Sequence, residues 1–158
     1  KAVVDKKKSV VFSKLLKAIA VAAREESNPA YNPRLRTLIE KARENAVPTE
    51  NIARAIAKTA DSAALEEITV EAYGPAGIAL ALYAITDNRN RTIHEIKNLL
   101  LEHHGKLAPP GSVQWAFDGD APKFPQQIQE NDRARIRTLI NALERHPDVQ
   151  RVIAAMAQ

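Results

Sequence analysis

The hydrophobic positions in residues 1–60 recur every three or four residues, which is the spacing of amphipathic helices. One such pattern covers residues 9–25. A second begins after Asn32, which has a good N-cap side chain and is followed by proline, and a third begins at Pro48. Because the connections are short, we predict a bundle of three helices, each with one apolar face turned inward.

The period changes from helical to strand-like after a polar link at residues 61–62. Residues 66–73 alternate between apolar and polar positions, whereas residues 78–85 are apolar throughout. Turn residues lie between them, so we predict a hairpin in which residues 66–73 form an edge strand with one face toward solvent.

The remaining pattern predicts two more helices and three more strands. The helices are expected from about Thr92 to Gly105 and over residues 131–145, and the strands at residues 112–117, 122–128 and 148–153. This order predicts an α+β fold, in which a three-helix domain (residues 1–60) precedes a ferredoxin-like βαββαβ domain (residues 61–158) with an extra N-terminal edge strand.

One face of the central predicted strand is more apolar than a solvent-facing sheet surface should be, because it carries Ala79, Ala81, Tyr83 and Ile85. We expect this face to be covered by the helical domain, by a second copy or by a partner. Trp115 alternates with Val113 and Phe117 and is interpreted as a core residue rather than as a platform for stacking bases, which requires several exposed aromatic side chains.

Charge divides the chain more sharply than its net value of +4 suggests. Residues 1–59 hold 13 Lys and Arg against 6 Asp and Glu, a net of +7, and the remaining residues hold 10 against 13, a net of −3. A basic part joined to a mildly acidic part is typical of a protein that contacts phosphate with one end, although a solvated helical surface gives the same asymmetry.

The candidate contacts to nucleic acid are the basic side chains on the outer faces of the predicted helices, together with a lysine run that is interpreted as a disordered arm which folds on a partner. With the loop discussed next, they are Lys6, Lys7, Lys8, Lys14, Lys17, Arg24, Arg34, Arg36, Lys41, Arg43, Arg54, Lys58, Asn88, Arg89, Asn90 and Arg91.

Residues 86–92, Thr-Asp-Asn-Arg-Asn-Arg-Thr, follow the most apolar strand and contain no apolar side chain. Thr92 and Glu95 have capping-box spacing, which predicts that a helix begins near Thr92 with its amides toward Arg89 and Arg91. Such a helix start is a candidate anion site. The alternative is structural, with Asp87 paired to one arginine and the asparagines satisfying the turn.

Enzymatic chemistry finds little support in the sequence. There is no cysteine, no glycine-rich phosphate loop and no pair of histidines at the spacing of a helical zinc site. The carboxylates are dispersed, so no pair is marked out for acid–base catalysis. We therefore expect a non-enzymatic protein without metal or cofactor, and no apolar stretch is long enough to predict a membrane span.

Several segments together resemble the YebC family, which includes probable transcriptional regulators and the mitochondrial translational activator of cytochrome c oxidase. The segments are FSKLLKAIAVAAREE, NPRLRTLIEKARENAVPTENIARAI, EEITVEAYGPAGIAL, TDNRNRT and GSVQWAF. The resemblance implies a helical N-terminal domain, ferredoxin-like α+β parts and action on nucleic acid, in the cytoplasm or, if a targeting peptide has been removed, in the mitochondrial matrix.

The sequence departs from this family in three places. The usual His-Ser-Lys-Trp arm is replaced by a shorter lysine-containing segment, and the glycine-rich turn before Gly111 reads Leu-Ala-Pro-Pro. Members usually carry a further domain between the strands that end near Phe117 and begin near Lys123, where this chain has five residues. We therefore expect a two-domain short form.

The combined interpretation is a nucleic-acid-binding regulatory factor, foremost a ribosome-associated translation factor that contacts rRNA or tRNA phosphates and aids elongation through difficult sequences. The alternative is a DNA-binding transcriptional regulator, although no predicted helix presents an evident base-reading face. A small-molecule-binding or catalytic ferredoxin-like module is a third class, which the charge asymmetry and the absence of a catalytic set disfavour.

Overall fold

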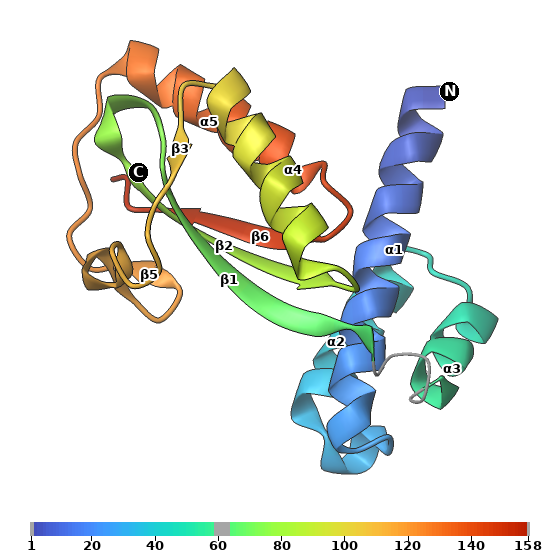
Figure 1. The fold of residues 1–158 in the computed structure, drawn as a ribbon. Coiled ribbons are helices and arrows are strands. Elements are labelled where there is room, and N and C mark those ends of the chain that lie inside the picture. The colour runs from blue at the N-terminus through green and yellow to red at the C-terminus, as the bar shows by residue number, and fades with distance from the viewer. Residues whose placement is uncertain (1, 59–63, 158) are drawn as a thin grey trace. The chain divides into compact units, whose positions relative to one another are not determined.

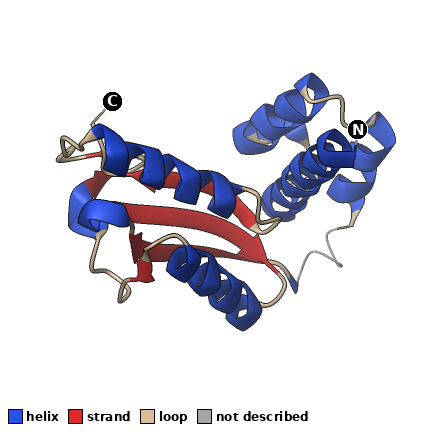
Figure 2. Ribbon diagram, turned by 90° about the horizontal axis from the view of Figure 1, so that it is seen from above, coloured by secondary structure: helices blue, strands red, loops and turns tan. Residues whose placement is uncertain are grey.

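The structure, a computed structural model, describes residues 2–58 and 64–157. The chain divides into two compact units, Lys1–Glu66 and Glu67–Gln158. The described regular structure of the first is helical up to Glu66, where the first strand begins, whereas the second combines strands and helices (Figure 2). The predicted α+β class is thus confirmed, with the helices first and the antiparallel sheet after them.

The first unit is built from α1 (Ala2–Glu25), α2 (Pro33–Glu44) and α3 (Thr49–Ala57), with a 3-10 turn at Pro29–Tyr31 (Figure 1). α1 packs against both of the shorter helices. Their shared core consists of apolar side chains at the predicted helical spacing. Its buried members are Leu15, Ile19, Ala22, Ala23, Leu35, Ile39, Ala42, Val47 and Ile52.

The prediction of a disordered lysine arm was wrong, because α1 begins at Ala2 and includes Lys6, Lys7 and Lys8. The segment contains neither glycine nor proline, and alanine and lysine are good helix formers. Nothing in the sequence therefore ends the helix ahead of its amphipathic part.

Asn32 joins two helix ends in the first unit. Its side chain is buried, and its Nδ2 group donates to the carbonyl oxygens of Ala22 and Glu26, each at 2.9 Å, at the end of α1. Its Oδ1 atom accepts from the backbone N–H of Leu35 at 3.0 Å, in the first turn of α2. One side chain thus satisfies orphan groups of both helices and fixes the bend between them.

The second unit contains a four-stranded sheet in the order β3-β1-β2-β6 and a separate β4-β5 hairpin. The helices α4 and α5 both lie on one face of the sheet (Figure 1). In chain order the elements are β1 (Glu66–Tyr73), β2 (Ala79–Thr86), α4 (Arg89–Glu102), β3 (Lys106–Leu107), β4 (Phe117–Asp118), β5 (Ala121–Pro122), α5 (Glu130–Glu144) and β6 (Val149–Ala154).

The core of this unit lies between the sheet and the two helices. Leu80 and Leu82 point from β2 into it and are fully buried, together with Ile96 and Leu100 of α4 and Leu139 of α5. Ile136 and Leu143 of α5 and Val149 of β6 are also fully buried in this core, and the antiparallel pairing of β2 with β6 completes the sheet.

Three strand assignments were wrong. Residues 122–128 do not form a strand, because β5 ends at Pro122 and Gln126 makes only an isolated bridge, to Met156. β1 is an interior strand, because the short β3 pairs with it on the outer side. Residues 112–117 do not form a strand, since Val113 has helical backbone angles and a 3-10 turn follows at Gln114–Ala116. The N–H of Val113 donates to the carboxylate of Glu71 at 3.1 Å instead of to a neighbouring strand.

Glu71 fixes this segment by accepting hydrogen bonds from its backbone. It was expected on the solvent face of its strand, yet it is buried, and its carboxylate also accepts from the N–H of Gly111. The segment around Val113 therefore covers part of the sheet face opposite the helices, where Ala81, Tyr83 and Phe117 line a common hollow. The chain itself supplies part of the cover that this apolar face requires.

Candidate nucleic-acid interface

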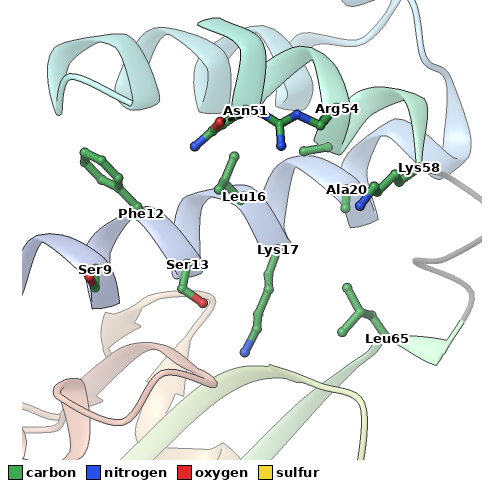
Figure 3. A pocket seen from close by; sticks show the side chains of 11 residues that line it. Ser9, Phe12, Ser13, Leu16, Lys17, Ala20, Asn51, Arg54, Lys58 and Leu65 are labelled. Carbon is green, nitrogen blue, oxygen red and sulfur yellow. Dashed lines mark hydrogen bonds between the residues drawn. The ribbon is translucent and has the colours of Figure 1, made fainter. Parts of the chain in front are cut away.

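The first unit carries a hollow of about 580 Å³ between α1 and α3. Phe12 and Leu16 of α1 point toward α3 and form its apolar floor, while Asn51, Arg54 and Lys58 line it from α3 (Figure 3). Phe12 and Leu16 remain half-buried because α3, with nine residues, is too short to cover the 24-residue α1 fully. The result is an apolar surface with cations along one side.

The cations of α3 are positioned by helical spacing. Arg54 and Lys58 lie four residues apart on one face and are both exposed, and the guanidinium of Arg54 donates to the Asn51 side chain at 3.1 Å. Lys17 of α1 also lines the hollow. Exposed cations held at this spacing suit the phosphates of a nucleic-acid backbone, which follow one another at intervals of several ångströms.

The cations of α2 lie on its outer surface, because its inner positions are taken by the core. Arg34, Arg36, Lys41 and Arg43 are all exposed. Arg36 also donates to the carbonyl oxygens of Pro29 and Ala30, at 2.9 and 3.0 Å, so its guanidinium closes the turn before the helix.

The other predicted cations of this unit are not gathered at the hollow. Arg24 donates to the carbonyl oxygen of Leu65 at 2.8 Å, Lys14 is half-buried and Lys8 is exposed. The side chains of Lys6 and Lys7 lie outside the described part of the chain. The structure thus brings together Lys17, Arg54 and Lys58 and spreads the remaining basic residues over the helices.

In the second unit, α4 begins three residues earlier than predicted. Asn88 is its N-cap and accepts from the N–H of Arg91 at 3.1 Å, so Arg89 and Arg91 belong to the first turn and do not precede the helix. Thr92 is fully buried, and its hydroxyl lies 2.6 Å from that of Thr86. Asn88 caps the helix instead of Thr92, because asparagine is at least as good an N-cap residue and the Thr92 hydroxyl is hydrogen-bonded to Thr86.

Arg91 is surrounded by carboxylates. Its guanidinium donates to Asp87 at 3.2 Å, to Glu95 at 2.5 Å and to the buried Asp148 at 2.8 Å. Hydrogen bonds to Glu95 and then to Asp148 raise the pKa of Arg91 above its ordinary value. Asp148 also accepts from the Thr92 hydroxyl at 2.7 Å, which ties the start of α4 to the chain before β6.

The side chains of the predicted phosphate site at residues 88–91 therefore differ in what they contact. The oxygen of Asn88 caps the helix and Arg91 is ion-paired, whereas Arg89 and Asn90 are exposed in the first turn. The assignment of this turn to a phosphate stays a prediction, and a phosphate at Arg91 would compete with three carboxylates.

Three buried polar residues were not recognised from the sequence as organising groups: Asn32 as a link between two helices, Glu71 and Asp148. Asp148 lies 57 positions from Arg91, so no local pattern could connect them. Glu71 lies on the strand face that the alternation assigns to solvent, beside the exposed Thr69, so the local pattern gave no signal that it is buried.

Within residues 2–58 and 64–157, histidines and carboxylates nowhere form a group of three that could ligate a metal. In the same part of the chain no helix has the length and apolar content of a membrane span.

An all-helical basic unit followed by an antiparallel α+β unit defines the class of this protein. Residues 1–62 match the model of the TACO1/YebC protein N-terminal domain, and residues 65–122 match that of the TACO1/YebC second and third domain. The chain belongs to the TACO1/YebC family, as the sequence resemblance predicted.

Similar proteins include probable transcriptional regulatory proteins from Pelodictyon phaeoclathratiforme, 47% identical over 121 residues, and Thermosipho melanesiensis, 48% identical over 122 residues. These matches cover 74% and 75% of this chain, which spans about half (48%) of each relative. The crystal structure of a conserved hypothetical protein from Aquifex aeolicus is similar at a TM-score of 0.88 and 30% identity, covering 99% of this chain and 93% of that one.

Proposed function

We propose that this protein is a nucleic-acid-binding regulatory factor whose helical unit holds the phosphate backbone. The observation that carries the proposal is the α1–α3 hollow, where Lys17, Arg54 and Lys58 are among the residues that line an apolar floor, in the part of the chain with a net charge of +7. Contacts of this kind supply affinity that does not depend on base sequence and that falls as salt rises.

The names of the relatives, probable transcriptional regulatory proteins, favour DNA as the target. Regulation of transcription is therefore our first assignment. It does not require a catalytic group from this chain.

A ribosome-associated role in translation is the second candidate, and one observation favours it. Apart from its cations α3 exposes Thr49, Glu50, Ala53 and Ala57, and such a face has few side chains that read base edges. A surface that contacts phosphates without reading bases suits structured RNA as well as it suits DNA.

The test combines a charge-removal variant with a salt series. Arg54→Ala/Lys58→Ala is expected to weaken binding to a 24-base-pair duplex about 10-fold and to lower the log–log salt slope by about 2, while the melting temperature stays unchanged. Arg135→Ala/Arg137→Ala is the matched control, because it removes the same charge from exposed positions of α5 in the other unit.

Co-sedimentation with ribosomes, measured in the same salt series, separates the two targets. Tight duplex binding without ribosome association favours transcription, and ribosome association lost steeply with salt favours translation. The proposal fails if neither target is bound, or if the α3 and α5 double variants weaken binding equally.

A further inference from the structure

The β4-β5 hairpin and its flanks expose the only tryptophan of the chain. Trp115 was expected in the core, and this interpretation was wrong, because 53% of the residue is exposed. Phe124, on the other side of the hairpin, is 59% exposed, and the two ring centroids lie 6.4 Å apart with the planes inclined at 32°. Two large aromatic rings in contact therefore face solvent together.

The backbone beneath this aromatic pair is firmly held. Val113 and Ala116, on either side of Trp115, are buried in the core of the unit. The N–H of Lys123 donates to the carbonyl oxygen of Ala116 at 2.7 Å, which fixes the residue before Phe124 to the turn that carries Trp115. Exposure is thus built into the fold, since the anchored neighbours leave the rings pointing outward.

We propose that Trp115 and Phe124 form a stacking platform for an unpaired base of single-stranded nucleic acid, an inference that rests on the proposed nucleic-acid binding. Stacking on exposed aromatic rings is the common way in which proteins hold single strands, because every base offers a π-face. The Lys123 ammonium lies over the Phe124 ring, 5.9 Å from its centroid, so a cation is available for the phosphate that adjoins a base stacked on the pair.

The surroundings favour a base over a protein surface. In the described part of the second unit, the other large exposed apolar side chain is Leu101, which belongs to α4 and not to the hairpin or its flanks. A stable protein interface needs about 800 Å² from each partner, whereas one ring face is enough for a base.

The charges near the hairpin make stacking the main contribution. Asp118 and Asp120 lie in it, and Asp120 accepts from the guanidinium of Arg151 at 2.5 Å. With acidic and basic groups mixed, the platform attracts phosphate weakly. Its share of the affinity is therefore expected to change little with salt, in contrast to the share of the basic helical unit.

The experiment uses Trp115 as its own probe. Unlabelled 12-nucleotide single-stranded RNA is titrated into the full chain, and tryptophan emission is recorded beside the anisotropy of a fluorescein-labelled copy of the same RNA. Stacking is expected to quench the emission with the same midpoint as the anisotropy. Trp115→Ala is expected to weaken single-strand binding about 5- to 100-fold, whereas Trp115→Phe retains most of the affinity.

Leu101→Ala, at an exposed apolar position of the same unit, is the matched control and is expected to change nothing. Anisotropy that reports binding without quenching, together with unchanged affinity of Trp115→Ala, overturns the platform, leaves the proposed function standing and makes a protein partner the better assignment. If the unaltered protein binds neither the RNA nor duplex DNA, the proposed function and the platform are both overturned. Quenching in the unaltered protein decides the matter even if a variant fails to fold.

Discussion

Two helices of this protein begin with the same chemistry and differ in what their arginines contact. α2 follows Asn32 and α4 follows Asn88, and in each case the asparagine oxygen accepts from an N–H three residues later, at 3.0 and 3.1 Å. Both first turns carry arginines, Arg36 among them in α2 and Arg91 in α4. From the local sequence alone, the two helix starts would be assigned the same role.

Their surroundings separate them. Arg36 donates to two neutral backbone carbonyl groups, so its positive charge remains uncompensated by those contacts. Arg91 meets three carboxylates, of which Asp148 is brought in by the fold from far along the chain. An arginine at a helix N-terminus is therefore an available anion contact only where tertiary structure leaves its charge unpaired.

The largest expected effect comes from removing the buried carboxylate of Asp148, which pairs with Arg91 at the start of α4. Asp148→Ala takes away the partner of Arg91 and the acceptor of the Thr92 hydroxyl, and we expect the free energy of unfolding to fall by about 2–4 kcal/mol. Urea unfolding measures the loss. Asp148→Asn, which keeps the shape and one oxygen, is expected to lose roughly half as much.

Asp120→Ala is the control for an exposed pair, because Asp120 contacts only the half-exposed guanidinium of Arg151 among its described side-chain partners. Its expected cost is about 0–1 kcal/mol. Equal losses for Asp148→Ala and Asp120→Ala would contradict the view that the α4 start is organised by a buried carboxylate. Since the pKa of Arg91 is raised, its contribution is fully present at neutral pH and is lost only in strongly alkaline solution.

The two caps give the next effect. Asn32 is buried and makes three hydrogen bonds that join α1 to α2, so Asn32→Ala is expected to lower the free energy of unfolding by about 2–3 kcal/mol. Asn88 is exposed and its side chain caps one helix, so Asn88→Ala is expected to cost about 1 kcal/mol. Thermal melting followed by circular dichroism compares the two, and a larger loss at Asn88 would reverse the ranking.

The spacing of hydrophobic residues predicted the helices and strands that follow a regular period. It could not predict contacts between side chains that are far apart in the sequence. The three helices, the central strand, α5 and β6 were predictable, because Leu35, Leu82 and Leu139 recur with their neighbours at helical or strand spacing. The strand expected at residues 112–117 was wrong, because the Glu71 carboxylate takes the N–H of Val113. In the candidate site, the outward cations of α3 followed from spacing, whereas the pairing of Arg91 depends on a residue 57 positions away.

The smallest effect concerns nucleic-acid binding at the two helix starts. Arg36→Ala is expected to weaken duplex binding about threefold and to lower the salt slope by about 0.9, the value for one phosphate contact. Arg91→Ala is expected to lower the melting temperature while the affinity of the folded protein holds, because three carboxylates already neutralise that guanidinium. The opposite result, unchanged melting with affinity and salt slope both reduced, would restore the phosphate contact predicted at residues 88–91 and show that phosphate displaces the carboxylates.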